Sequence, residues 1–300
     1  MSTRKNAVHS TVTALGALLT VVASALVPGT AAAQEAPPLP HDVPVMLIGD
    51  PGFEPDRIVP FEATLTMGRG DKAGPLEIGE ALEPRAFQTL SLERAVRDGR
   101  DVFVRSFSTA LPDGTVVATG HIVLDAETLI PLGSEIEQQG NVRSFAYDWE
   151  TFTITQSPAP ADGSAPAIEH ADLRMFEAAV HDIWMAALPL RQGFRARVPV
   201  MMAGGGGKYW AVPHVVGSTN FDPGNGDRLE AWVVELDWWG MGKDGAMFFP
   251  GGGANDTGGT GGKYWILKNP PAGTPAVVRV RTEVDADNDS VIQLQGQSDE

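Results

Sequence analysis

The sequence predicts a mainly β fold with one main helix. Short runs of alternating apolar and polar residues, separated by turn signals, recur through most of the chain, which is typical of an antiparallel meander. One segment, residues 167–188, instead repeats apolar residues every three or four positions, which is typical of a helix with one buried face. Because a lone amphipathic helix between two sets of strands has to bury this face, we expect it to pack on the sheet.

The first set of strands precedes residue 157. Residues 57–67 form the first expected strand, and residues 81–97 fit either a short helix or a pair of strands. Glycine in Pro112-Asp113-Gly114 supplies the positive φ that a tight turn needs, and Gly140-Asn141 marks a second turn. Around these turns, strands are expected over residues 102–109, 115–124, 129–138, 142–147 and 151–156.

The helix is predicted over residues 167–188, and Pro189 ends it. Its apolar face is expected to consist of Leu173, Phe176, Val180, Ile183, Trp184 and Leu188. The opposite, polar side is marked by Asp172, Glu177 and Asp182. The preceding stretch 157–166 is rich in proline, alanine and glycine, so we expect it to divide a single domain of residues 61–284 into halves 61–156 and 167–284.

The second set of strands follows the helix. Strands are expected over residues 194–202, 208–216, 229–238, 264–268 and 276–284. Two of them begin with the same sequence, Gly-Gly-Lys-Tyr-Trp, at residues 206–210 and 261–265. Residues 240–262 are expected to form a mobile, glycine-rich loop, and the acidic tail 285–300 is expected to fray.

Aromatic residues of this second set supply the candidate site. Successive residues of a strand point to opposite faces, so Tyr209 and Trp210 face opposite sides, as do Tyr264 and Trp265. Ordinary packing explains these residues, and so does an apolar groove for a lipid or an aromatic platform for sugar rings. The residues expected to line an apolar groove are Trp184, Tyr209, Trp210, Trp232, Val234, Trp238, Tyr264 and Trp265.

The first 33 residues have the pattern of an export signal. Arg4 and Lys5 give the positive start, residues 14–27 the apolar stretch, and Ala31-Ala32-Ala33 the cleavage site. This apolar stretch is shorter than the roughly 20 residues of a membrane span, so no integral span is expected after cleavage. We therefore expect a periplasmic or secreted protein that uses the general secretory route, with a proline-rich lead-in over residues 34–60.

Composition removes several classes of function. The formal net charge of −16 repels nucleic acid and anionic lipid headgroups, so no nucleic-acid partner is expected. The chain has no cysteine, which excludes disulfides, a thiolate nucleophile and cysteine metal sites.

Common catalytic and ligand-binding motifs do not occur in the sequence. The glycine–lysine boxes lack the spacing of a phosphate loop, the histidines lack metal-ligand spacing, and no G-x-S-x-G elbow occurs. We therefore expect no metal, no cofactor and no enzymatic activity. Two alternatives stay open: weak calcium binding by residues 285–289, and a secreted hydrolase that uses carboxylates among Asp222, Asp227, Glu230, Glu235 and Asp237.

Several short segments together resemble a known family. They read LDAETLIPL at 124–132, LPL at 188–190, VPHVV at 212–216, EAWVVE at 230–235 and KYWI at 263–266. In this order they resemble the bacterial periplasmic domain-of-unknown-function family 3108, over roughly residues 102–284. The resemblance implies a curved, unclosed antiparallel half-barrel, similar to the lipoprotein-localisation carriers, with residues 167–188 over the concave face.

The same resemblance implies an apolar ligand. A lipid or acyl chain is expected between the helix and the strands that bear Trp210, Trp232 and Trp265, and an envelope protein is a further expected partner. The main alternative is a carbohydrate- or envelope-binding β-sandwich module, which would expose its aromatic residues in a coplanar row.

Overall fold

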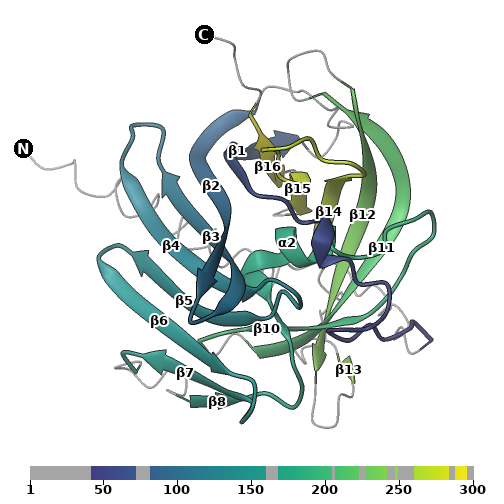
Figure 1. Cartoon of the computed structure of the whole chain (residues 1–300). Helices are drawn as coiled ribbons and strands as arrows, with labels where there is room; N and C mark the ends of the chain where they lie inside the picture. Colours follow the sequence, from purple (N-terminus) through teal and green to yellow (C-terminus); the bar gives the residue numbers. More distant parts are fainter. Residues whose placement is uncertain are drawn as a thin grey trace, which may run out of the picture.

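One antiparallel sheet makes up most of the molecule. A computed structural model describes residues 42–71, 82–159, 168–204, 207–222, 228–241, 247–248, 260–283 and 288–295. All sixteen strands within these ranges belong to the same sheet, which curls around the helix α2 (His181–Ala186) (Figure 1). The mainly β half-barrel with a helix on its concave side is therefore confirmed, while the expected export signal and residues 34–41 of the lead-in lie outside the described residues.

The first eight strands form a meander in chain order. They are β1 (Phe61–Asp71), β2 (Glu83–Arg97), β3 (Arg100–Ala110), β4 (Val116–Asp125), β5 (Pro131–Gln138), β6 (Asn141–Asp148), β7 (Thr153–Ser157) and β8 (Ile168–His170). The ambiguous segment 81–97 thus forms one long strand from Glu83, because β1 and β3 pair with it on both edges. The break at 157–166 falls between β7 and β8, which also pair with each other.

The second set of strands forms the other side of the sheet. It consists of β9 (Phe176–Glu177), β10 (Val198–Met202), β11 (Gly207–Phe221), β12 (Leu229–Met241), β13 (Met247–Phe248), β14 (Thr260–Leu267), β15 (Val277–Glu283) and β16 (Asn288–Leu294). Of the expected glycine-rich loop, the described residues form the end of β12, the short β13 paired with it, and the start of β14.

The tail closes the gap between the two sets of strands. β16 lies between β1 and β15 and pairs with both, so the expectation that the tail frays is wrong for residues 288–294. Two flanking strands satisfy the backbone donors and acceptors of β16, and Val291 is fully buried, which explains why this segment becomes a strand. The segment considered as an alternative calcium site, residues 285–289, lies mostly outside the described residues.

The predicted helix is much shorter than expected. Within residues 168–188 the structure has the strands β8 and β9, the 3-10 turn η3 (Ala178–Val180) and only then α2. The predicted apolar face is nevertheless buried, since Phe176, Val180 and Trp184 are fully covered. Glu177, predicted on the polar side, is buried as well, because β9 packs on both of its faces and has no solvent side.

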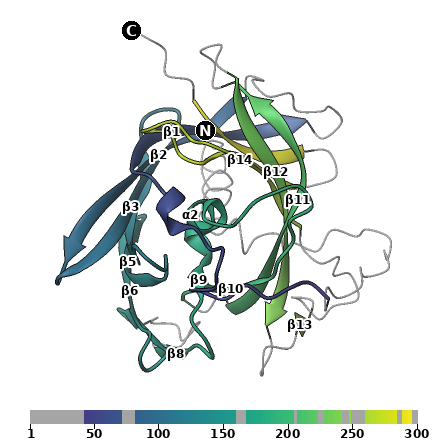
Figure 2. The same ribbon diagram turned by 45° about the vertical axis from the view of Figure 1, so that its right-hand side comes forward.

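Three apolar clusters hold the sheet in its curved form. The largest fills the concave side and joins α2 to strands of both sets, and Figure 2 shows α2 between them. A second cluster lies where the two ends of the sheet approach each other, with Phe145 and Tyr147 of β6 beside Met201 of β10 and Trp210 of β11. A third, smaller cluster on the outer face includes Trp265.

Candidate functional site

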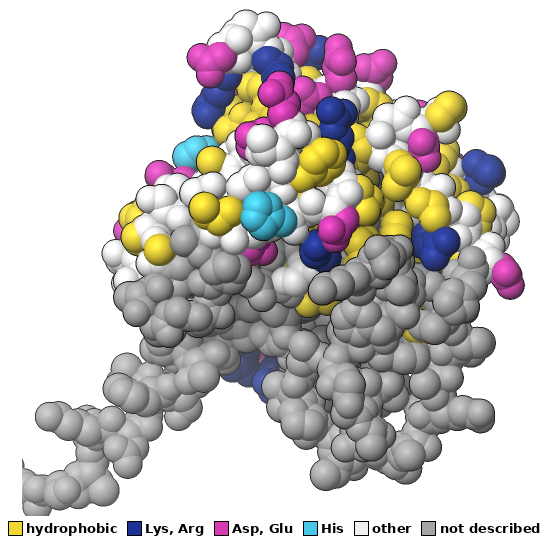
Figure 3. All heavy atoms as spheres, turned by 90° about the horizontal axis from the view of Figure 1, so that it is seen from below, with side chains coloured by type: hydrophobic (Ala, Val, Ile, Leu, Met, Phe, Trp, Pro, Cys, Tyr) yellow, Lys and Arg dark blue, Asp and Glu magenta, His cyan; other side chains and the backbone are white. Residues whose placement is uncertain are grey.

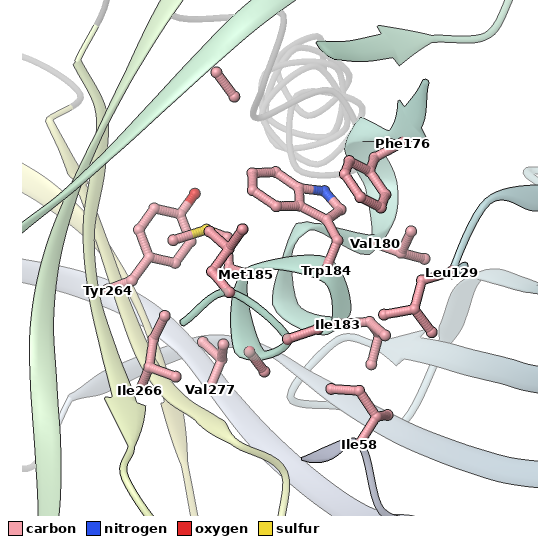
Figure 4. Packing of buried hydrophobic residues seen from close by; sticks show 14 of the residues in the cluster. Ile58, Leu129, Phe176, Val180, Ile183, Trp184, Met185, Tyr264, Ile266 and Val277 are labelled. Atoms are coloured by element: carbon pink, nitrogen blue, oxygen red, sulfur yellow. The ribbon is translucent and has the colours of Figure 1, made fainter. Parts of the chain in front are cut away.

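The concave side of the half-barrel is filled by the segment 178–188, which we call the plug. Figure 4 shows Trp184 of the plug beside Phe176, and Met185 of the plug beside Tyr264 on the other side. The rings of Phe176 and Trp184 stack with centroids 5.6 Å apart. Trp184, Met185, Ala187 and Leu188 have no exposed surface, so the plug is part of the core in this conformation.

Six of the eight predicted groove residues meet around the plug. Trp184, Val234, Trp238 and Tyr264 are buried members of the interior cluster, and Tyr209 and Trp232 pack against its margin. Tyr209 and Trp238 lie edge to face with ring centroids 6.0 Å apart. These side chains of β11, β12 and β14 lie together because alternation along paired strands puts them on one face of the sheet.

Trp210 and Trp265 lie away from the plug. Trp210 belongs to the cluster at the ends of the sheet and Trp265 to the outer cluster, so no single groove contains all eight residues. Each is covered by a guanidinium group, Arg197 at 5.3 Å from the ring of Trp210 and Arg279 at 5.0 Å from that of Trp265. The expectation that these two tryptophans flank a ligand beside the helix is not met by this arrangement.

An ion pair and an aromatic contact link the plug to the strands around it. Arg105 of β3 donates from Nε to Oδ2 of Asp182 at 3.1 Å, and both side chains are largely buried. The imidazole of His181 meets the ring of Tyr264 edge to face, and its Nδ1 lies 2.9 Å from the carbonyl oxygen of Ala178. Burial lowers the pKa of His181, while neighbouring Asp182 acts against that shift.

The lead-in holds the plug from the open side. The backbone N–H of Glu54 donates to the carbonyl of Ala187 at 2.8 Å, and Nη1 of Arg57 donates to that of Leu188 at 3.1 Å. Arg57 and Asp182 also line a small hollow beside α2, whose other walls are Ile58, Val59, Phe61, Ile183, Ala186, Pro270, Pro275, Ala276 and Val277. Its volume of about 10 Å³ is room for one water molecule, so the hollow is too small for an apolar ligand in this conformation.

Another polar contact, away from the plug anchor at Asp182, is buried where the two ends of the sheet meet. The hydroxyl of Tyr147 on β6 donates to Oε2 of Glu177 on β9 at 2.9 Å. Burial raises the pKa of Glu177 to about 7, against the hydrogen bonds that it accepts. No local pattern indicates this pair in the sequence, because the two residues are 30 positions apart and Glu177 fits the polar side of a helix.

Comparison with known families assigns the chain. The model of the family described as "Protein of unknown function (DUF3108)" matches residues 83–293, which is more than half of the chain. The protein belongs to the DUF3108 family. No curated protein sequence matches significantly.

A solved structure can be set beside this DUF3108 protein. It is a chain described as a "putative lipoprotein" from Parabacteroides distasonis, with 11% sequence identity and a TM-score of 0.31. The match covers 80% of this chain and 96% of that chain. Because the score is below 0.5, we draw no conclusion from it.

The carboxylates that a hydrolase would use lie on strand surfaces in this DUF3108 protein. Glu230 pairs with Lys268 at 3.2 Å and Glu235 with Lys263 at 3.1 Å, across the β12·β14 ladder. Partial burial raises the pKa of Asp237, with Glu235 adding to the shift and Arg195 opposing it. Asp227 lies outside the described residues.

The remaining surface of the DUF3108 fold is mixed in character. Apolar, acidic and basic side chains alternate on the face that Figure 3 shows. An open hollow of about 410 Å³ over β3, β4 and β5 has polar walls that include His121, Glu135 and Glu137. In the described part of the chain, no three His, Asp or Glu side chains gather as a metal site would require, and no helix is long and apolar enough to cross a membrane.

Proposed function

We propose that the protein is an exported, non-enzymatic binding protein that takes up an apolar ligand, a lipid or an acyl chain, when the plug leaves the half-barrel. Export is supported by the residue pattern of the first 33 positions. Ligand binding is supported above all by one observation: the apolar concave face is occupied by a short segment that forms no strand pairing with it.

The way in which the plug is held supports a movable element. α2 has six residues and lies in the interior through side-chain packing, with the Arg105–Asp182 ion pair linking it to β3. Removing charges from water costs several kcal/mol per ion, so apolar residues in the same place would hold the plug at least as firmly. A buried ion pair at this position is therefore better suited to fixing one arrangement than to maximising stability.

The vacated space would suit an apolar chain. Its walls would include Val234, Trp238, Tyr264 and Ile266, all buried in the interior cluster. The small hollow between the lead-in and α2 marks the side from which a chain could follow the departing plug. The non-enzymatic part of the proposal is supported by Glu230 and Glu235, which are engaged in surface ion pairs with lysines.

Binding of a fluorescent fatty acid, together with native mass spectrometry of protein purified from its own periplasm, tests this proposal. Apparent affinity scales with the fraction of molecules that have the plug out, so Asp182→Asn, which loosens the plug, should tighten binding about tenfold for each tenfold rise in that fraction. The matched double variant Arg105→Met/Asp182→Leu should bind more weakly than the wild type. Absence of co-purified lipid, and of fatty-acid binding in the wild type and in Asp182→Asn, would refute a carrier role.

A further inference from the structure

The two ends of the open sheet are fastened by side chains instead of by a strand ladder. Tyr147 lies on β6, third from one edge, and Glu177 lies on β9, the strand at the other edge. Beside them Oε1 of Glu169 on β8 accepts from the N–H of Gly204 at 2.9 Å. Farther along, Nζ of Lys208 on β11 contacts Oδ2 of Asp172 at 2.6 Å. We call this set of contacts the seam.

The Tyr147–Glu177 pair is the buried part of the seam. Glu177 is 4% exposed and Tyr147 8% exposed, inside the cluster that contains Phe145, Met201 and Trp210. By contrast, Asp172 and Lys208 remain partly in solvent. An ionised carboxylate in such a place needs either a cation or water, and the hydrogen-bond partners of Glu177 are the Tyr147 hydroxyl and the backbone N–H groups of Ala178, Ala179 and Ala203.

Other polar groups border the pair without supplying a positive charge. Ser134 of β5 hydrogen-bonds to Tyr147, and the negative charge of Glu169 lies near enough to affect Tyr147. Oε1 of Gln156 on β7 is buried beside the seam with no hydrogen-bond partner. Lys208 already faces Asp172. Loss of the proton from Glu177 therefore adds a charge that its neighbours do not neutralise.

We propose that the Tyr147–Glu177 contact is a proton-controlled latch between the two ends of the sheet. Protonation of Glu177 favours the closed seam, whose geometry is the one described above. When Glu177 ionises, hydration of its carboxylate favours separation of β9 and residues 203–204 from β6 and β8. This opening does not depend on whether a ligand binds, although it involves the contact from the N–H of Ala179 in the plug to Glu177.

The sign and the range of the effect follow from proton linkage. Glu177 titrates near 4.5 when the seam is open to water and at about 7 when it is closed, so the closed form holds more protons between these values. The opening equilibrium should therefore rise up to about tenfold per pH unit between pH 5 and 7 and level off above pH 7. At pH 5 the seam should be closed most firmly.

Hydrogen exchange of the full mature chain between pH 5 and 8.5, corrected for intrinsic rates, tests the latch. Amides of β6, β7, β9 and β10 should lose protection up to pH 7, while those of β2 and β3 provide an internal reference. Glu177→Gln should abolish this pH dependence. Tyr147→Phe removes a hydrogen bond that favours the ionised form, so its plateau should move to higher pH, a shift that loss of packing would not produce.

A matched control separates the latch from the rest of the seam. Glu169→Gln removes a neighbouring carboxylate but should leave the transition in place. A flat wild-type profile, or an unchanged profile in Glu177→Gln, would overturn the proposal. If Glu177→Gln fails to fold, the wild-type profile and the direction of the Tyr147→Phe shift still decide it, because a plateau that stays in place or moves to lower pH contradicts the latch.

Discussion

Arg105 of β3 and Asp182 of α2 form an ion pair across the concave side of the half-barrel, with 3.1 Å between Nε and Oδ2. The side chains are 9% and 14% exposed. Because Oδ1 of Asp182 has no hydrogen-bond partner, the pair is incompletely satisfied as well as buried. Its contribution to stability therefore depends on which partner is removed, and this gives the first prediction.

Asp182→Asn should destabilise the protein by about 3 kcal/mol, because it leaves the Arg105 guanidinium buried without a counter-charge. The double variant Arg105→Met/Asp182→Leu should recover most of this loss, since it buries no charge. Urea unfolding measures both. As a control, Arg94→Ala removes the exposed Arg94–Asp101 pair and should cost no more than about 1 kcal/mol. Equal losses in the single and double variants would show that charge burial is not the cause.

Trp184 provides a second test of the plug. Its side chain is fully buried against Phe176, and its Nε1 has no hydrogen-bond partner. Trp184→Ala should therefore cost about 3–5 kcal/mol through the cavity that it leaves, whereas Trp184→Phe keeps most of the packing and removes an unsatisfied donor. We expect thermal unfolding to place Trp184→Phe well above Trp184→Ala. Similar values for the two variants would mean that the plug does not contribute to the core in solution.

The strands were predictable from the sequence because alternation in a half-buried sheet leaves a direct trace. Val102 and Phe103, for example, lie in β3, which was expected together with its neighbour β4, whereas its other neighbour β2 was left open between a helix and a pair of strands. The helix was overextended because residues 175–177 are all buried, and an apolar residue at every third or fourth position then arises without a helix. β16 was missed because it begins with the polar residues Asn288, Asp289 and Ser290 and because one of its two pairing partners, β1, lies far from it in the sequence.

The candidate site was predictable only in part, for a related reason. Strand alternation separated Tyr209 from Trp210 and Tyr264 from Trp265, and the structure keeps both separations. Which member of each pair faces the plug depends on the direction in which the sheet curls, and this is a property of the whole sheet. The Tyr147–Glu177 contact depends on how the two sheet ends meet, which local patterns do not encode.

Gly262 in the second Gly-Gly-Lys-Tyr-Trp box gives a backbone prediction. Its φ is +106°, and a Cβ at this position would collide with the carbonyl oxygen of Arg281 and lie 3.1 Å from Oγ1 of Thr282. Gly262→Ala should therefore cost at least about 2 kcal/mol in urea unfolding. Gly217 is the matched control, since it has no positive φ and no atom within 4 Å of an added Cβ. A Gly262→Ala variant as stable as Gly217→Ala would contradict this account.

The last prediction concerns the pH dependence of global stability, in which His181 and Glu177 act in opposite directions. Burial lowers the pKa of His181 below its ordinary 6.5, so the unfolded chain binds more protons as the pH falls below 6.5 and stability is lost. Burial raises the pKa of Glu177 from 4.5 to about 7, so stability is lost as the pH rises through that range.

Unfolding free energies at pH 5 to 7.5 separate the two groups. His181→Gln should remove the acid-side loss, so its stability relative to wild type should improve steadily as the pH falls from 6.5. Glu177→Gln should do the reverse and gain relative to wild type as the pH rises to 7. Because neither group shifts the pKa of the other, the two difference curves should add in the double variant. Parallel curves for wild type and His181→Gln would mean that His181 is solvated in the folded protein.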